Sequence, residues 1–287
     1  MPYSRLANPS ATIAVLKRFG LYARKSLGQH FLIDDNIVGR ILDTARLAPG
    51  EPVLEVGPGI GTLTDALLSA GAHVVAVERD AKLIPVLREL EDERPGRLAL
   101  VHADAVTVPV ASLVTPAGAP TALVANLPYG VAATVVLRYL QELPSIGRAV
   151  VMVQSEVADR MGASPGTKSY GSYTVKLALV GEITERFGVA RSCFLPPPRV
   201  DSAVVRIDRT TRPEADAVRA CAARAADAAF SQRRKTIRNS LGAGLGLESE
   251  EVARLLASAG IDGSRRAESV TVDEYVRLGG AVHAAGL

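Results

Sequence analysis

The chain has 287 residues, of which 48% are hydrophobic and 22% are charged, as in folded proteins with one large and one small domain. Its two cysteines, Cys193 and Cys221, lie far apart without a partner motif, which argues against a disulfide framework or a cysteine-based metal site. We recognise neither an export signal nor an apolar run long enough to span a membrane. We therefore expect a cytoplasmic protein without a membrane partner.

The net charge of +3 is unevenly distributed along the chain. All charged residues before Asp34 are basic, and a second basic group follows late in the sequence, at Arg233, Arg234, Lys235 and Arg238. Two separated basic groups suit a phosphate backbone. Charged runs also commonly mark solvated surfaces, so both interpretations stay open at this point.

Short aliphatic runs alternate with longer helical stretches between residues 52 and 154. Nearly continuous apolar runs of this kind are typical of a parallel sheet covered on both faces, and the helical spacing of residues 62–69 predicts a crossover helix. Two further strands are expected at 185–190 and 203–207. The pattern predicts an α/β fold with a doubly wound, Rossmann-like sheet. Its first five strands are expected at residues 53–56, 73–77, 98–101, 122–125 and 149–153.

The pattern changes after Asp208, where a polar stretch resembles a linker. Alanine-rich segments at 215–230, 248–259 and 271–284 predict helices. We therefore expect a domain over residues 1–208, with a basic N-terminal arm over 1–33, and a small helical domain over 209–287.

Glycines follow the first expected strand, in the segment Glu55-Val-Gly-Pro-Gly-Ile-Gly61. Gly57 and Gly59 allow the backbone to approach a ligand closely. The spacing differs from that of the dinucleotide fingerprint, whose helix N-terminus receives a pyrophosphate. Pro58 stiffens the turn and Glu55 adds a negative charge, which suits the amino-acid portion and sulfonium of S-adenosylmethionine better than phosphates.

Two acids follow the next strands. Glu78 ends the second strand, where a carboxylate is able to accept both hydroxyls of a ribose, and Asp104 follows the third strand, in position to accept from an adenine amine. Acids at successive strand ends indicate a cofactor site. His30 and His102 have no metal-ligand spacing, so we expect no metal.

The segment Asn126-Leu127-Pro128-Tyr129 closes the fourth strand. It offers hydrogen-bond acceptors beside an aromatic ring, which are the groups that an exocyclic amine on a purine needs. The same four residues also make an ordinary turn, because Pro fixes φ and Asn caps the next segment. The cofactor loop upstream favours the binding interpretation.

The chain resembles the S-adenosylmethionine-dependent rRNA adenine N6,N6-dimethyltransferases, and most of all the bacterial small-subunit members. The resemblance runs nearly end to end, and its motifs are moderate signals individually but strong in this order. They are Ser26 to Asp34, the Glu55 to Gly61 loop, Val77 to Asp80, Asp104, Asn126 to Tyr129, Phe194 to Ala203 (Phe-Leu-Pro-Pro-Pro-Arg-Val-Asp-Ser-Ala) and Phe230 to Asn239 (Phe-Ser-Gln-Arg-Arg-Lys-Thr-Ile-Arg-Asn).

The resemblance implies a class I methyltransferase domain with a helical RNA-binding domain. His30, Leu32, Gly57, Glu78, Asp104 and Asn126 would then line the S-adenosylmethionine pocket, although many relatives have Asn where this chain has His30. The implied substrate is a pair of adjacent adenosines in the 3′-terminal hairpin loop of 16S rRNA, modified during small-subunit assembly. Phe194 would be a second aromatic face for the base, or else a core aromatic.

The target dictates the chemistry that we expect. The lone pair of adenine N6 is delocalised into the ring until hydrogen-bond acceptors draw the amine towards tetrahedral geometry. Asn126 Oδ1 and the Leu127 carbonyl are the candidate acceptors, and Tyr129 is the stacking face for a base that has left its stack. Orientation and desolvation would supply most of the acceleration. RNA would be held by the basic arm and by Arg233, Arg234, Lys235 and Arg238, with Arg234 or Lys235 alternatively engaged in intramolecular ion pairs.

Three other functions are compatible with parts of the pattern. A 23S rRNA adenine methyltransferase of macrolide resistance shares the Asn-x-Pro-Tyr element, but the motifs at 194–203 and 233–239 favour the small-subunit enzyme. A non-catalytic assembly or transcription factor is disfavoured by the intact Asn126 and Tyr129. A nucleotide-dependent oxidoreductase is disfavoured by the glycine spacing. The sequence shows no exposed heptad seam, so we expect a monomer.

Overall fold

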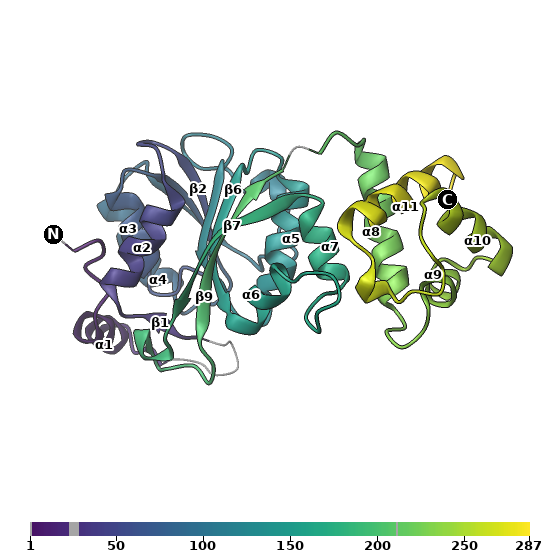
Figure 1. The fold of residues 1–287 in the computed structure, drawn as a ribbon. Helices are drawn as coiled ribbons and strands as arrows, with labels where there is room; N and C mark the ends of the chain where they lie inside the picture. Colours follow the sequence, from purple (N-terminus) through teal and green to yellow (C-terminus); the bar gives the residue numbers. More distant parts are fainter. Residues whose placement is uncertain (1, 23–28, 211) are drawn as a thin grey trace. The chain divides into compact units, whose positions relative to one another are not determined.

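Seven strands form the main sheet of the computed structural model, which describes residues 2–22, 29–210 and 212–287 (Figure 1). A separate two-stranded sheet pairs β1 (Phe31–Leu32) antiparallel with β8 (Phe194–Leu195). The strands of the main sheet lie in the order β4-β3-β2-β5-β6-β9-β7. Their bounds are β2 Pro52–Val56, β3 His73–Glu78, β4 Leu98–His102, β5 Ala122–Asn126, β6 Arg148–Gln154, β7 Gly181–Val189 and β9 Ser202–Arg209.

Helices connect the strands and form the C-terminal part of the chain. Asp34 starts one of them by accepting at Oδ1 from the backbone N–H groups of Asn36 and Ile37, at 3.0 and 3.3 Å. The described helices are α1 Pro9–Arg18, α2 Asp35–Ala45, α3 Thr62–Ser69, α4 Ile84–Glu93, α5 Ala132–Glu142, α6 Ser155–Met161, α7 Ser172–Ala178, α8 Asp216–Phe230, α9 Ile237–Leu245, α10 Ser249–Ser258 and α11 Val272–Ala284, with 3-10 turns η2 Val110–Ser112, η3 Arg191–Cys193 and η4 Ala267–Ser269.

The main sheet is doubly wound, which confirms the predicted α/β class. From β2 the chain proceeds to β3 and β4 on one side and then to β5 and β6 on the other, with all four pairings parallel. Because a right-handed crossover that reverses direction also changes face, α3 and α4 lie on one side of the sheet and α5 on the other (Figure 1). The chain returns through β9, which pairs antiparallel with β6.

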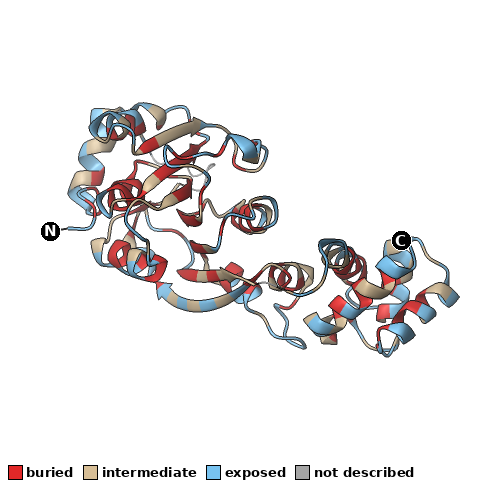
Figure 2. Ribbon diagram, turned by 90° about the horizontal axis from the view of Figure 1, so that it is seen from above, coloured by how far each residue is buried: buried red, intermediate tan, exposed pale blue. Residues whose placement is uncertain are grey.

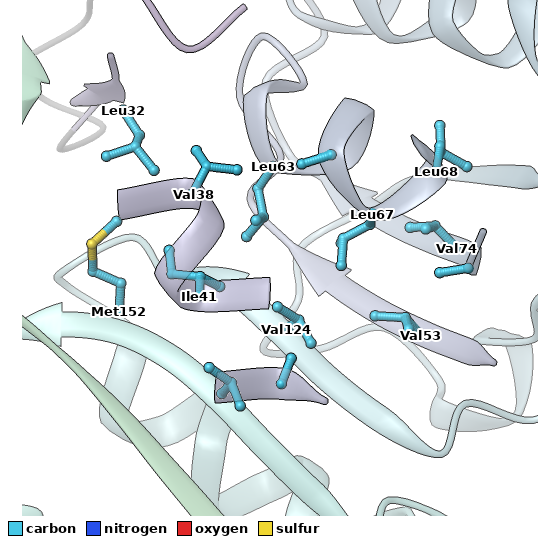
Figure 3. Close-up of a cluster of buried hydrophobic side chains, with 14 of the residues drawn as sticks. Leu32, Val38, Ile41, Val53, Leu63, Leu67, Leu68, Val74, Val124 and Met152 are labelled. Carbon is cyan, nitrogen blue, oxygen red and sulfur yellow. The ribbon is translucent and has the colours of Figure 1, made fainter. Parts of the chain in front are cut away.

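The core of the sheet lies under α2 and α3. The strands are largely buried, as the aliphatic runs predict (Figure 2), and Val53, Leu67 and Val74 are each 0% exposed. Figure 3 shows side chains of α2 and α3 directed toward those of the strands in one cluster. Burying an aliphatic side chain of this size contributes about 1.5–3 kcal/mol, so this packing fixes the strands whose ends carry the polar residues described below.

The chain divides into two compact units. The sheet unit comprises residues 1–158 and 183–209, and the helical unit comprises residues 159–182 and 210–287. Arg209 groups with the sheet unit, one residue past the expected boundary between 208 and 209, and residues 159–182 group with the helical unit. The physical reason is that Tyr170 and Val175 are fully buried in the core of that unit.

Small residues permit close helix packing in the helical unit. A Cβ atom added to Gly279 of α11 would lie 2.6 Å from the backbone nitrogen of Ala222 in α8, and one added to Gly244 of α9 would lie 2.6 Å from the Cα atom of Ala228. The alanine-rich sequence of α8 therefore has a packing role, since larger side chains would separate these helices.

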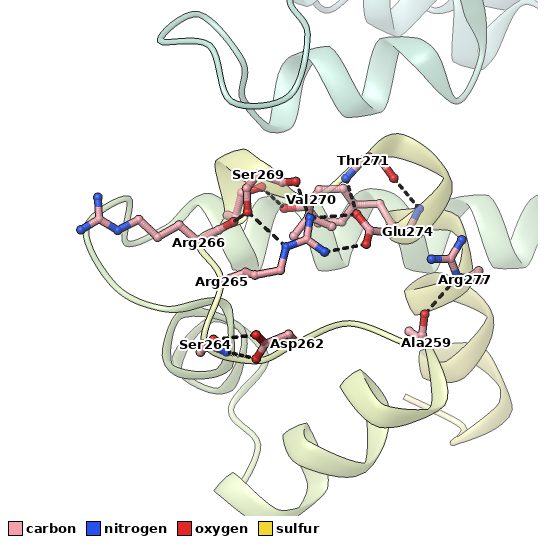
Figure 4. Close-up of polar contacts among 12 residues, drawn as sticks. Ala259, Asp262, Ser264, Arg265, Arg266, Ser269, Val270, Thr271, Glu274 and Arg277 are labelled. Atoms are coloured by element: carbon pink, nitrogen blue, oxygen red, sulfur yellow. Dashed lines mark hydrogen bonds and ion pairs between the residues drawn. The ribbon is translucent and has the colours of Figure 1, made fainter.

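The N-terminus of α11 is held by a polar network (Figure 4). Thr271 Oγ1 accepts from the N–H of Glu274 at 3.2 Å, and Glu274 Oε2 accepts from the N–H of Thr271 at 2.7 Å, which is a capping box. Arg265 also contacts both carboxylate oxygens of Glu274, at 2.6 and 3.1 Å. The Arg265 guanidinium is the main reason that the pKa of Glu274 falls to about 2.

Among the described residues, no helix combines the length and the apolar character that crossing a membrane requires.

Candidate functional site

A cavity of about 430 Å³ lies at the carboxyl ends of β2, β3, β4 and β5, where the order of the strands reverses. Its lining contains every residue that the sequence assigned to cofactor binding, and four of the five assigned to catalysis. These residues are His30, Leu32, Glu55, Gly57, Gly59, Glu78, Asp104, Asn126, Leu127, Pro128 and Tyr129.

The glycine loop between β2 and α3 is shaped by left-handed backbone conformations. Gly57 has φ +68° and Gly61 has φ +88°, which side-chain-bearing residues rarely adopt. A Cβ atom at Gly57 would lie 3.0 Å from the ring of Pro128, and one at Gly61 would collide with Leu90 Cδ1. The two loops at the carboxyl ends of β2 and β5 thus approach each other closely because Gly57 has no side chain.

The acid at the end of β3 is fixed by backbone donors. Glu78 Oε1 accepts from the N–H of Asp80 at 2.7 Å, and Oε2 accepts from the N–H of Gly59 at 3.3 Å. Burial nevertheless raises the pKa of Glu78 above its ordinary value. Each carboxylate oxygen has two acceptor positions, so Glu78 retains capacity to accept from a ligand hydroxyl.

The acid that follows β4 is also oriented. Asp104 Oδ1 accepts from the N–H of Val106 at 2.9 Å, and Oδ2 forms an ion pair with Arg79 Nη1 at 3.3 Å. Glu78, at the end of β3, and Asp104, just after β4, thus present fixed carboxylates at the same edge of the sheet, because the two strands are parallel neighbours.

Glu55 lies deeper in the cavity wall. Its side chain is 1% exposed, and Oε2 accepts from Thr64 Oγ1 at 2.6 Å. Burial raises the pKa of Glu55 to about 8, with a further contribution from the charge of Glu78. The negative charge expected from the sequence is therefore suppressed at neutral pH unless a cationic group enters the cavity.

The segment at the end of β5 is anchored on both sides. The N–H of Leu127 donates to the Met152 carbonyl at 3.1 Å, and Asn126 Nδ2 donates to the His30 carbonyl at 3.5 Å. A carbonyl oxygen only accepts, so the Asn126 side-chain nitrogen must face His30. The side-chain oxygen, Oδ1, is then available to accept a hydrogen bond from another group.

The ring of Tyr129 has two neighbours. Its hydroxyl shares a hydrogen bond with Ser202 Oγ at 2.9 Å, and its face stacks on the His30 ring with centroids 5.6 Å apart and 28° between the planes. His30 Nδ1 lies 2.7 Å from the Pro196 carbonyl, which requires the proton on Nδ1. Burial raises the pKa of Tyr129, so the hydroxyl remains protonated.

The expectation that Phe194 supplies a second aromatic face is not supported by its position. Phe194 is 2% exposed, belongs to the core cluster of the sheet and is absent from the cavity lining. Its place follows from strand pairing, because Phe194 stands opposite Leu32 in the β1–β8 ladder. The alternative of a core aromatic is the one that the structure shows.

The late basic residues lie in the helical unit: Arg233, Arg234 and Lys235 follow α8, and Arg238 lies in the first turn of α9. All four are exposed. Arg233 Nη2 donates to the carbonyls of Lys168 and Tyr170 at 3.4 and 3.3 Å. Among the described residues, Arg234 and Lys235 form no intramolecular ion pair, so that alternative to RNA contact is not supported. Arg24 and Lys25 of the basic arm, and positions 26–28 of the motif that begins at Ser26, lie outside the described residues.

The sequence predicted no role for Thr62 or for Ser202. Thr62 lines the cavity, and its hydroxyl is buried without a hydrogen-bond partner among the described residues. Ser202 belongs to the motif at 194–203 but had no predicted role, because nothing in the sequence indicates that it contacts Tyr129, 73 residues earlier. A cavity of this size with fixed acids, an unpartnered hydroxyl and a glycine cradle fits a ligand of the size and polarity of S-adenosylmethionine.

Comparison with known proteins identifies the family. The model of the family described as ribosomal RNA adenine dimethylase matches residues 20–281. A ribosomal RNA small subunit methyltransferase A from Streptomyces griseus is 45% identical over 278 residues, which cover 95% of this chain and 94% of the relative.

Two solved structures have the same fold. The 23S rRNA methyltransferase ErmE is 30% identical, with a TM-score of 0.64, over 88% of this chain and 99% of that one. A dimethyladenosine transferase from Plasmodium falciparum is 22% identical, with a TM-score of 0.72, over 90% of this chain and 99% of that one. The chain therefore belongs to the ribosomal RNA adenine dimethylase family, whose cofactor is S-adenosylmethionine.

Proposed function

We propose that this chain transfers methyl groups to N6 of two adjacent adenosines in the 3′-terminal hairpin loop of 16S rRNA, giving N6,N6-dimethyladenosine during small-subunit assembly. The observation that carries the proposal is the juxtaposition, in one cavity, of the fixed acids Glu78 and Asp104 with the acceptors and aromatic ring of residues 126–129. One part suits an adenosine cofactor, and the other suits a target adenine.

S-adenosylmethionine, when bound, supplies an electrophilic methyl group. Glu78 would accept from its ribose hydroxyls and Asp104 from its adenine amine, while Gly57 and Gly59 would allow its amino-acid portion to approach the backbone. Burial raises the pKa of Glu55, so this residue is largely protonated when the cavity holds no cation. A cationic group beside it would favour the charged carboxylate.

The chain's own catalytic contribution is orientation of the target amine. Asn126 Oδ1 and the Leu127 carbonyl would accept from the two N–H groups of adenine N6, which directs the nitrogen lone pair toward the methyl donor. Tyr129 would stack on the extruded base. No strong base is required, because N6 loses its proton to water after transfer.

Recognition of the RNA would rest mainly on the shape of the RNA and on contacts to its charged backbone, with the bases of the loop splayed out. The exposed residues Arg234, Lys235 and Arg238 are the proposed phosphate contacts in the helical unit, and Arg233 shares this role with its contacts to Lys168 and Tyr170. We propose that the protein acts in the cytoplasm, as a monomer, on the small subunit or its precursor.

The 23S rRNA of macrolide resistance is the alternative substrate. Relatives that are named ribosomal RNA small subunit methyltransferase A are 45% identical to this chain, whereas ErmE is 30% identical. This difference favours 16S rRNA as the substrate. A non-catalytic factor is disfavoured because Asn126 and Tyr129 are both present and line the cavity.

The test is incubation of the purified protein with labelled S-adenosylmethionine and, in separate reactions, unmodified small subunits and unmodified large-subunit rRNA. Mass spectrometry then maps the products. Dimethyladenosine confined to adjacent adenosines of 16S rRNA is expected. Label confined to 23S rRNA, or cofactor binding without transfer to either, would overturn the proposal.

A further inference from the structure

We infer that Ser202 is a positioning residue for the second methyl transfer, acting through its hydrogen bond with Tyr129. The inference rests on the proposed function and goes beyond it, because it distinguishes the two transfers to one adenosine. Ser202 lies outside the cavity lining, is 0% exposed and contacts Tyr129 through its hydroxyl at 2.9 Å.

Ser202 is a rigid anchor. It begins β9 and stands opposite Gln154 in the antiparallel ladder with β6, and the carbonyl of its neighbour Asp201 accepts from the N–H of Ser155 at 3.0 Å. The backbone of Ser202 is thereby fixed, so its hydroxyl restrains the far end of the Tyr129 side chain. His30 stacks on one face of the same ring, so we place the base against the opposite face.

The two transfers differ in how the target amine is held. In each, the N6 lone pair forms the bond to the methyl carbon as the carbon–sulfur bond breaks, sulfur keeps the bonding electrons as a neutral thioether, and N6 then releases one proton to water. Unmodified adenine N6 has two N–H groups for Asn126 Oδ1 and the Leu127 carbonyl. Monomethylated N6 has only one.

The second transfer therefore depends more on stacking. With one of two amine hydrogen bonds gone, the orientation of the base relies on a Tyr129 ring that does not swing away. Ser202 and His30 hold that ring from the hydroxyl end and from one face. Loosening the ring should impair the second transfer more than the first.

The experiment compares wild type, Ser202→Ala, Tyr129→Phe and the double variant in time courses on unmodified small subunits, with mono- and dimethyladenosine quantified separately. Removing the hydroxyl at either end should lower the second-step rate by about three- to tenfold, the worth of one hydrogen bond, and monomethyladenosine should accumulate. The double variant should be no worse than either single variant, because both remove the same hydrogen bond.

Ser240→Ala is the matched control. Ser240 is also 0% exposed, and its hydroxyl donates to the Thr236 carbonyl at 3.1 Å, but it lies in α9 of the helical unit. Its mono-to-dimethyl ratio should equal that of wild type. Melting temperature and S-adenosylmethionine affinity are measured for all variants, and Ser202→Ala should retain the wild-type affinity.

Each remaining outcome decides the matter. A wild-type enzyme that dimethylates 16S rRNA, together with an unchanged product ratio in Ser202→Ala, would overturn the inference and leave the proposed function intact. Equal slowing of both transfers with a lowered melting temperature would assign Ser202 a merely structural role. A wild-type protein that transfers no methyl group to 16S rRNA would remove the proposed function and the inference together.

Discussion

The sheet unit and the helical unit position their functional side chains by different means. In the sheet unit, polar residues stand where strands end, and backbone donors fix them: Glu78 and Asp104 each accept from a nearby N–H group. In the helical unit, the proposed RNA contacts are exposed side chains between α8 and α9 and at the start of α9. The difference teaches that the end of a strand fixes the position of a single side chain, which then has one defined role in the site. Each exposed charge, in contrast, contributes only weakly to RNA binding.

The largest expected effect tests a side chain that is positioned by the end of a strand. Asn126→Ala should lower methyl transfer by about 10²- to 10³-fold, as removal of one preorganised polar group does at other active sites. RNA binding should stay nearly intact, because Asn126 lies in the cavity and not on the basic surface. Asn239→Ala, at an exposed position of α9, is the control with the same change in chemistry. Near wild-type turnover by Asn126→Ala would contradict the assigned role.

The second effect concerns the buried acid of the cavity. The folded-state pKa of Glu55 is about 8 against an ordinary value of 4.5, so the folded protein keeps a proton that the unfolded chain releases between these values. Raising the pH from 5 to 8 should therefore lower the free energy of unfolding by at most about 1.4 kcal/mol per pH unit. Glu55→Gln should remove this component. Urea titrations across this range give the comparison, and parallel pH profiles for the two proteins would refute it.

The third effect concerns the helical unit, where close packing between helices requires a small residue at certain positions. Gly279→Ala should destabilise this unit by about 1–3 kcal/mol, because the added Cβ atom meets the backbone of α8. Gly280→Ala is an unusually close control: it is the next residue of α11, and an added Cβ atom has nothing within 4 Å. That variant should gain up to about 1 kcal/mol from helix propensity. Equal effects of the two substitutions in thermal melts would argue against close packing at Gly279.

The sequence predicted the sheet unit well for a physical reason. Buried parallel strands need continuous aliphatic runs, and the residues directly after such runs must gather at one edge, which located Glu78, Asp104 and Asn126 without knowledge of the fold. Contacts between distant segments leave no such local signal. The burial of Phe194 follows from β8 pairing with β1, and the bond between Tyr129 and Ser202 follows from β9 pairing with β6, so both depend on segments late in the chain that pair with earlier ones.

Local pattern was less informative in the helical unit. Helix α9 was not predicted, because Gly242 and Gly244 lower the helix propensity of its nine residues, and packing against α8 and α10 stabilises it instead. Residues 159–182 were assigned to the sheet unit, since aromatic burial within the helical core has no periodic signature. The basic run likewise gave no means of separating Arg233, which contacts backbone carbonyls, from Arg234 and Lys235.

The smallest effect tests that separation among the basic residues. Charge reversal at Arg234 and Lys235 together should weaken binding of the 16S rRNA hairpin by about tenfold, or about 1.4 kcal/mol. The slope of log affinity against log salt should become shallower by about 0.7–0.9 for each phosphate that is no longer neutralised. Turnover at saturating RNA should change little, because neither residue lines the cavity.

The matched control reverses Arg224 and Arg254, which are exposed in α8 and α10 of the same unit and have no ion pair among the described residues. Both double variants change the net charge by the same amount, so a general electrostatic effect would weaken binding equally in the two. A shallower salt slope in the first variant alone would assign the phosphate contacts to the stretch after α8. Equal slopes would mean that the helical unit attracts RNA only through its overall charge. No single basic residue of that unit would then have a defined role comparable to that of Asn126 in the sheet unit.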